Sequence, residues 1–136
     1  MLFRFNLNQI DKAVDFLEEH LKTTIICFDG PMGAGKTTLI SELCRKWDVH
    51  NSISSPTFSI VNHYISTSKG TIYHFDFYRL KNIEEAMDIG IDEYLESDNY
   101  CLIEWGERIR SMLPPHNKVN LSINEDQSRT INIVII

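Results

Sequence analysis

Cysteine is scarce in this chain and is not arranged as a disulfide framework. The three cysteines, Cys27, Cys44 and Cys101, are an odd number, lie far apart and form no CxxC pair. Each stands beside apolar residues, so we expect reduced, buried thiols. Such thiols favour a cytosolic protein and argue against a small secreted fold held by disulfides.

Basic charge and long apolar runs are also lacking. Thirteen Lys and Arg against nineteen Asp and Glu give a net charge of −6, whereas a domain that grips nucleic acid unaided is usually basic. No apolar run exceeds six residues, far short of the roughly 20 that a membrane-spanning helix needs. Residues 1–4 turn polar at once and predict no signal peptide. We therefore expect a cytoplasmic protein without membrane contact, which would reach nucleic acid only through a partner.

The patterns that are present predict one α/β domain spanning residues 1–136. Apolar residues recur at helical spacing over residues 9–21, with Asn8 as the expected N-cap. Residues 24–28 are β-branched and apolar, as in a parallel strand buried on both faces. A glycine-rich loop follows, and then a helix over residues 36–47.

The second half of the chain predicts hairpins around a further buried strand. We expect strands at 58–66, 71–77, 100–104, 119–123 and 130–136, and short helices at 82–88, 92–96 and 105–112. The last strand carries the run INIVII, which would promote aggregation if exposed, so we expect it to be paired and covered.

The glycine-rich loop matches the phosphate-binding pattern G-x-x-x-x-G-K-[ST] without substitution. It comprises Gly30, Pro31, Met32, Gly33, Ala34, Gly35, Lys36 and Thr37, with Thr38 next in the helix. Backbone N–H groups of such a loop, and the N-terminus of the following helix, point at phosphate oxygens. Lys36 can then reach the β- and γ-phosphates, and the Thr37 hydroxyl can bind Mg²⁺. A chance glycine-rich turn is the alternative, but a buried strand before the loop and a periodic helix after it favour the nucleotide site.

Two carboxylates can assist this loop. Glu104 directly follows the apolar residues 100–103, which predicts that it lies at the carboxyl edge of the sheet, where ligands bind. Asp76 lies late in the strand 71–77 and shares a face with Ile72 and His74. Each can also be a solvated charge at the end of a strand, and the pattern leaves open which of the two contacts a metal.

Thr57, in Ser55-Pro56-Thr57-Phe58, is a third candidate. Pro56 holds Ser55 extended, and Thr57 can approach the γ-phosphate as a switch-loop threonine does. Four residues of this kind can equally be a turn before a strand.

In order along the chain, the segments GPMGAGKTT, SPTFSIVNHY, HFDFYRL, GIDEYL and IEWGER resemble the bacterial TsaE (YjeE) family. The match runs from about residue 16 to residue 108, and the combination is far more specific than the phosphate loop alone. The family commonly has an acidic residue where Pro31 stands, and often a proline where Gly106 stands.

The resemblance implies a three-layer P-loop NTPase fold with a mainly parallel central sheet plus antiparallel hairpin strands. It also implies an ATPase that uses Mg²⁺ and is weak alone. Its partners would be the TsaD and TsaB proteins, which transfer threonylcarbamoyl to adenosine 37 of tRNAs, and it would meet tRNA only through that complex. The nucleotide cycle would support turnover of this machinery.

The resemblance also implies roles for individual residues. Lys36 and Thr37 would contact phosphate and metal, and Thr57 would be the switch threonine. Asp76 would be the essential aspartate. Glu104 would be the Walker-B-type carboxylate at the metal, with Trp105 beside the nucleotide.

Two other functions remain open on the residues alone. A small P-loop kinase would use the same loop, but 136 residues leave little room for a lid, and the six arginines form no cluster that could cover a γ-phosphate. A nucleotide-gated binding module would bind ATP without hydrolysing it. Phosphate release and acceptor phosphorylation separate the three functions.

Overall fold

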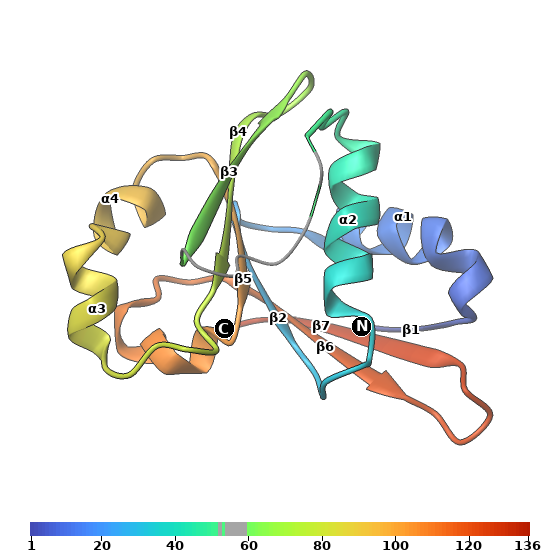
Figure 1. Ribbon diagram of the computed structural model, residues 1–136. Helices are drawn as coiled ribbons and strands as arrows, with labels where there is room; N and C mark the ends of the chain where they lie inside the picture. The colour runs from blue at the N-terminus through green and yellow to red at the C-terminus, as the bar shows by residue number, and fades with distance from the viewer. Residues whose placement is uncertain (52, 54–59) are drawn as a thin grey trace.

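A computed structural model describes residues 1–51, 53 and 60–136 of the chain (Figure 1). These residues form one seven-stranded sheet in the order β1-β7-β6-β2-β5-β4-β3. The strands are β1 (Leu2–Phe5), β2 (Ile25–Asp29), β3 (Val61–Ser66), β4 (Gly70–Asp76), β5 (Tyr100–Glu104), β6 (Asn117–Ile123) and β7 (Arg129–Ile135). The helices are α1 (Ile10–His20), α2 (Lys36–Lys46), α3 (Ile83–Asp88) and α4 (Ile91–Leu95), with 3-10 helices η1 (Leu7–Gln9) and η2 (Gly106–Met112).

The centre of the sheet is parallel and its edges are antiparallel. Strands β6, β2, β5 and β4 run parallel to one another. On one side β7 and β1 continue the sheet antiparallel, and on the other β3 forms a hairpin with β4. This arrangement confirms the expected α/β sheet, with a parallel core extended by hairpin strands.

Helices cover both faces of the sheet, which gives three layers (Figure 1). On one face α1 and α2 pack against the sheet through a core that includes Leu17, Leu43 and Leu102. On the other face α3, α4 and η2 enclose a second core around Phe75 and Ile103. Because both faces are covered, β2 and β5 are apolar along almost their whole length.

The predicted start of the first helix is wrong. Asn8 lies inside η1, and the chain turns at Asn6 instead, two residues earlier. The side-chain oxygen of Gln9 accepts from the Asn6 backbone N–H at 3.3 Å, the arrangement of a capping box. The glutamine three residues after Asn6 therefore selects this position, and α1 itself starts only at Ile10.

Other boundaries differ by a few residues from the predicted ones. Strand β6 begins at Asn117, two residues before the expected start, because its side chain bonds across to β2 and the segment before it. Its amide nitrogen donates to the carbonyls of Thr23 and Ile25, each at 2.9 Å, and its oxygen accepts from the Lys22 N–H at 2.8 Å. Residues 58 and 59 of the predicted 58–66 strand lie outside the described residues.

The terminal apolar run is paired as expected, but it is only partly covered. β7 lies between β6 and β1, and Ile131 and Ile133 point into the core, 0% and 4% exposed. Val134, Ile135 and Ile136 are 36–61% exposed. The first part of the run is therefore covered, whereas its last three residues are not.

The cysteines are as predicted. All three are free and buried, and burial raises the pKa of each thiol to about 12. The helices within the described parts of the chain are too short or too polar to cross a bilayer.

Candidate functional site

The loop that joins β2 to α2 has the backbone of a phosphate cradle. Gly30 has φ 153° and approaches β6 so closely that a Cβ there would lie 2.5 Å from the Leu121 carbonyl oxygen. Gly35 has φ 104° and is the N-cap of α2, a left-handed conformation that glycine adopts without strain. The loop therefore leads directly into the N-terminus of α2, where the helix dipole favours an anion.

Lys36 and Thr37 are the first residues of α2 and reach toward the cavity beside the loop. The Lys36 ammonium donates to the Gly30 carbonyl at 2.9 Å and lies 4.5 Å from the centre of the Trp105 ring. An ammonium held by one neutral carbonyl and an aromatic face can transfer to a phosphate, which offers stronger, charge-assisted hydrogen bonds.

The two candidate carboxylates meet at the same edge of the sheet. Asp76 and Glu104 are paired residues of the parallel strands β4 and β5, and both lie on the face that α2 covers. Glu104 is only 4% exposed, and its Oε1 accepts from the Thr37 hydroxyl at 3.5 Å. The strand register therefore joins both carboxylates to the start of α2.

Asp76 is half-buried, and burial raises the pKa of its carboxyl group. The neighbouring charge of Glu104 raises it further, while the Tyr78 N–H, which donates to Asp76 Oδ1 at 3.0 Å, lowers it. Two carboxylates side by side in a partly dry site repel each other, which makes the position suited to a cation.

His74 completes this group, and sequence reasoning assigned it no role. Its Nε2 lies 2.8 Å from Glu104 Oε2, and its Nδ1 lies 2.9 Å from the Tyr64 hydroxyl. His74 is 0% exposed. The signal that could have found it is the alternation in β4, which places His74 on the same face as Asp76, in a strand whose other residues there are apolar.

Trp105 lies beside the cavity in a strained conformation. It has φ 60° and ψ 41° at the start of η2, the left-handed region that is costly for a bulky side chain. Its ring lies 5.1 Å from the ring of Tyr78. Gly106 follows so close to Cys27 that an added Cβ would lie 3.0 Å from its Sγ, which fixes the turn that directs Trp105 at Lys36.

Most of the predicted site residues line one cavity of about 400 Å³. Those that do are Met32, Gly33, Gly35, Lys36, Thr37, Thr38, Asp76, Glu104 and Trp105, together with Tyr78, which was not predicted. Gly30 contributes its carbonyl, Ala34 is buried with its carbonyl bonded to Arg129 Nε at 3.1 Å, and Pro31 does not line the cavity. Thr57 lies outside the described residues, so its role stays a prediction.

The donor set at this cavity suits Mg²⁺ held partly by a nucleotide. Among the described residues, no three His, Cys, Asp or Glu side chains form a metal cluster. Mg²⁺ bound with a nucleoside triphosphate needs no such cluster, since phosphates and water supply most of its ligands. Thr37 and Glu104, which both line this cavity, could complete that shell.

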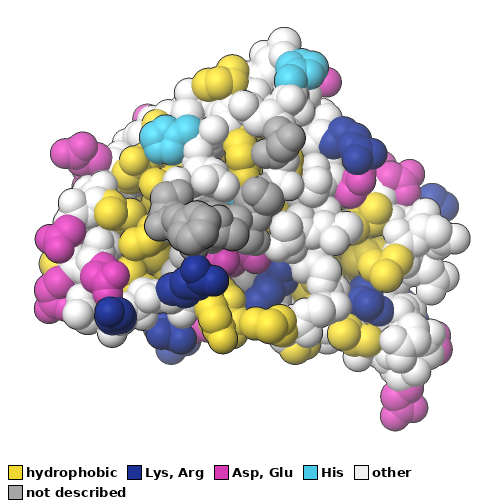
Figure 2. Space-filling view, viewed as in Figure 1, with side chains coloured by type: hydrophobic (Ala, Val, Ile, Leu, Met, Phe, Trp, Pro, Cys, Tyr) yellow, Lys and Arg dark blue, Asp and Glu magenta, His cyan; other side chains and the backbone are white. Residues whose placement is uncertain are grey.

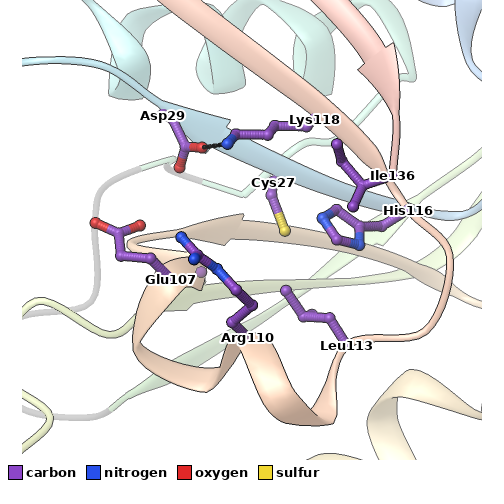
Figure 3. A pocket seen from close by; sticks show the side chains of 9 residues that line it. Cys27, Asp29, Glu107, Arg110, Leu113, His116, Lys118 and Ile136 are labelled. Atoms are coloured by element: carbon purple, nitrogen blue, oxygen red, sulfur yellow. Dashed lines mark ion pairs between the residues drawn. The ribbon is translucent and has the colours of Figure 1, made fainter.

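A second cavity, of about 280 Å³, lies on the opposite face of β2 (Figure 3). The Lys118 ammonium and the Asp29 carboxylate form an ion pair across it at 3.7 Å, and burial raises the pKa of Asp29. None of Gly33, Lys36 and Thr37 lines it. The cavity on the α2 face is therefore the candidate nucleotide site.

Comparison with known proteins points to one family. The family model described as "Threonylcarbamoyl adenosine biosynthesis protein TsaE" matches residues 6–132. The chain is 39% identical to a protein of Rickettsia felis over 137 residues, covering 98% of this chain and 79% of the relative. It is 37% identical to a protein of Haemophilus influenzae, covering 83% and 71%. Both relatives are named tRNA threonylcarbamoyladenosine biosynthesis protein TsaE.

A solved structure shares the fold. The crystal structure of YdiB from Bacillus subtilis aligns with a TM-score of 0.74 at 25% identity, covering 98% of this chain and 83% of that one.

Proposed function

The chain belongs to the TsaE family, and from this premise we propose that it is a cytoplasmic ATPase of tRNA threonylcarbamoyladenosine synthesis. It would act as one domain over residues 1–136, with ATP and Mg²⁺ as its cofactors. The observation that carries the proposal is the convergence of the loop, Lys36, Thr37, Asp76 and Glu104 at one cavity. A chain that shared only the fold of the family would have no reason to bring these groups together at one cavity.

The role proposed for each residue follows from its position at the cavity. Backbone N–H groups of the loop and the Lys36 ammonium would bind the β- and γ-phosphates. The Thr37 hydroxyl and Glu104 would hold Mg²⁺, which neutralises charge on the phosphates when bound. Asp76, one strand away from Glu104 at the same edge, would orient the attacking water, and Trp105 would cover the nucleotide.

The cavity supports an ATPase that is slow alone. Lys36 is the one cation among the described residues that line it. An arginine supplied by a partner can raise the hydrolysis rate of a P-loop NTPase by about 10³–10⁵-fold. We propose that the TsaD and TsaB proteins complete the site.

The surface charge supports a tRNA contact made through those partners. Acidic side chains gather over α3 and α4 (Figure 2), where Glu84, Asp88, Asp92 and Glu93 are exposed. With a net charge of −6, the chain would repel a phosphate backbone rather than bind it.

Phosphate release tests this function. It should be measured for the chain alone, with tRNA, and with TsaD and TsaB, each against Lys36→Ala. We expect stimulation only with the two proteins and its loss in the variant. Full activity in isolation or with tRNA alone would contradict the proposal, phosphorylation of an added acceptor would indicate a kinase, and binding without phosphate release would indicate a nucleotide-gated module.

A further inference from the structure

A chain of hydrogen bonds runs from β3 through β4 to Glu104. The Asn62 amide nitrogen lies 3.4 Å from the Tyr64 hydroxyl, which lies 2.9 Å from His74 Nδ1. His74 Nε2 then lies 2.8 Å from Glu104 Oε2. These residues share one face of three neighbouring strands. Asn62 pairs with His74, and His74 lies two residues along β4 from Asp76, the partner of Glu104.

The direction of the bonds follows from the groups at the two ends. An ionised carboxylate only accepts, so His74 Nε2 donates to Glu104. A neutral imidazole that donates from Nε2 presents Nδ1 as an acceptor, to which the Tyr64 hydroxyl can donate. The Asn62 amide can donate to the same hydroxyl oxygen. Every donor therefore points toward Glu104, and the Tyr64 hydroxyl satisfies the acceptor nitrogen of the tautomer that the carboxylate requires.

This series of hydrogen bonds gives the two oxygens of Glu104 different partners. Oε2 is bonded to His74, while Oε1 lies 3.5 Å from the Thr37 hydroxyl. Since a carboxylate is planar, fixing one oxygen on an immobile, fully buried imidazole also fixes the direction of the other. Oε1 is thus directed to the start of α2, where the metal would lie.

A histidine that merely fills the core would bond to the nearest available acceptor and would have no consequence for a metal. His74 instead lies on β4 between Ile72 and the site. It is 0% exposed, and its partner Tyr64 is 3% exposed. Burying these polar groups costs free energy unless they are paired. An apolar residue would avoid that cost, so the pairing with Glu104 is the feature that needs a function.

We propose that His74 is a positioning residue that aims Glu104 at the metal, and that Tyr64 holds the ring of His74 in place through Nδ1. The role rests on the proposed function, because it concerns the same carboxylate. His74 and Tyr64 would support the metal ligand without touching the metal. In other metal sites, mutation of such supporting residues changes metal affinity by about 10–100-fold.

The first measurement concerns the protein without nucleotide. Long-range proton–nitrogen NMR of the histidine rings reports which nitrogen carries the proton. We expect His74 with the proton on Nε2 both in the wild type and in Tyr64→Phe, because Glu104 only accepts in either protein. A proton on Nδ1 in the wild type would overturn the proposal regardless of whether the chain binds ATP.

The second measurement is Mn²⁺ affinity by electron paramagnetic resonance, with a non-hydrolysable ATP analogue present. We expect His74→Leu to weaken Mn²⁺ binding about 10-fold or more, with nucleotide affinity in EDTA unchanged. His74→Gln should restore most of the affinity, since its amide can donate to Glu104. Phe75→Leu, an equally buried neighbour on the other face of β4, is the control for general damage to the core and should leave Mn²⁺ binding unchanged.

A double-mutant cycle separates positioning from a structural role. If His74 acts only through Glu104, His74→Leu should add no further loss of Mn²⁺ affinity in a Glu104→Gln background. Additive losses, or an unchanged affinity in His74→Leu, would contradict the role while leaving the proposed function intact. Failure of the wild type to bind Mn²⁺ with the analogue would overturn the proposed function and this role together.

Discussion

Asp76 and Glu104 are register partners at the ends of two parallel strands, so the sheet holds two carboxylates beside each other at the mouth of the phosphate loop. Neither belongs to the loop that we propose binds phosphate. Their arrangement therefore predicts different effects on nucleotide binding and on turnover.

Asp76→Asn and Glu104→Gln should reduce ATP hydrolysis more than ATP affinity. Charge shifts on the phosphates mainly in the transition state, where a correctly placed group contributes about 10²–10³-fold, and we expect losses of that size in partner-stimulated turnover. Isothermal titration and phosphate release with both variants measure the two effects. Glu107→Gln, an exposed carboxylate outside this cavity, is the control, and equal losses of affinity and turnover in the two site variants would contradict the division.

Lys36→Ala should reduce ATP affinity at least about tenfold. Charge-assisted hydrogen bonds contribute about 1.5–3 kcal/mol, and 1.4 kcal/mol corresponds to about a tenfold change in affinity. Isothermal titration is the measurement, with the exposed Lys12→Ala on α1 as the matched control. Unchanged affinity in Lys36→Ala would rule out the loop as the nucleotide site.

Trp105 should report nucleotide binding by fluorescence, and Trp47 should not. The Trp105 ring lies 4.5 Å from the Lys36 ammonium, which moves if it binds phosphate. Trp47 is buried at the far end of α2, with its ring 4.4 Å from that of Tyr100. Titration of ATP into Trp105→Phe and Trp47→Phe tests the assignment, and a signal that persists in the first and vanishes in the second would reverse it.

Asp126 should stabilise the β6–β7 turn in a way that depends on pH. Hydrogen bonds from the Ser128 hydroxyl and N–H to its Oδ1, at 2.6 and 3.0 Å, and the ion pair with Arg4, lower the pKa of Asp126 to about 2. A lowered carboxyl pKa stabilises the fold above the ordinary value of 3.8, and this stabilisation is lost as pH falls toward about 2.

Asp126→Asn should therefore lower the Tm at pH 7 and have little effect near pH 2. Thermal unfolding at both pH values is the measurement, with Glu125→Gln in the same turn as the control. A Tm difference for Asp126→Asn that is as large at pH 2 as at pH 7 would show that the charge is not responsible.

The sequence was sufficient where the determining interactions are local. The loop from Gly30 to Thr37 is defined by eight consecutive residues, and its backbone and helix follow from glycine positions and helical spacing. The sequence predicts Glu104 at the carboxyl edge of the sheet, because a strand that is buried on both faces ends where its apolar residues give way to a charged one.

The rest depends on how distant segments pair. The contact between His74 and Glu104 needs the register of β4 against β5, and Tyr64 joins it only through the β3–β4 hairpin. Alternation shows which face His74 occupies, but not which residue it meets there. At the N-terminal end, Asn8 was expected as the N-cap of the first helix, but Asn6 caps η1, where the side chain of Gln9 accepts from its backbone N–H.

The central claim is that the nucleotide cycle of this chain supports repeated rounds of tRNA modification. The most direct measurement is the number of threonylcarbamoyladenosine residues formed per TsaD molecule, with excess tRNA and threonylcarbamoyl donor, TsaB, and either the wild-type chain or Lys36→Ala. We expect many rounds with the wild type and about one with the variant. Equal yields with the two proteins, or many rounds without either, would contradict the account.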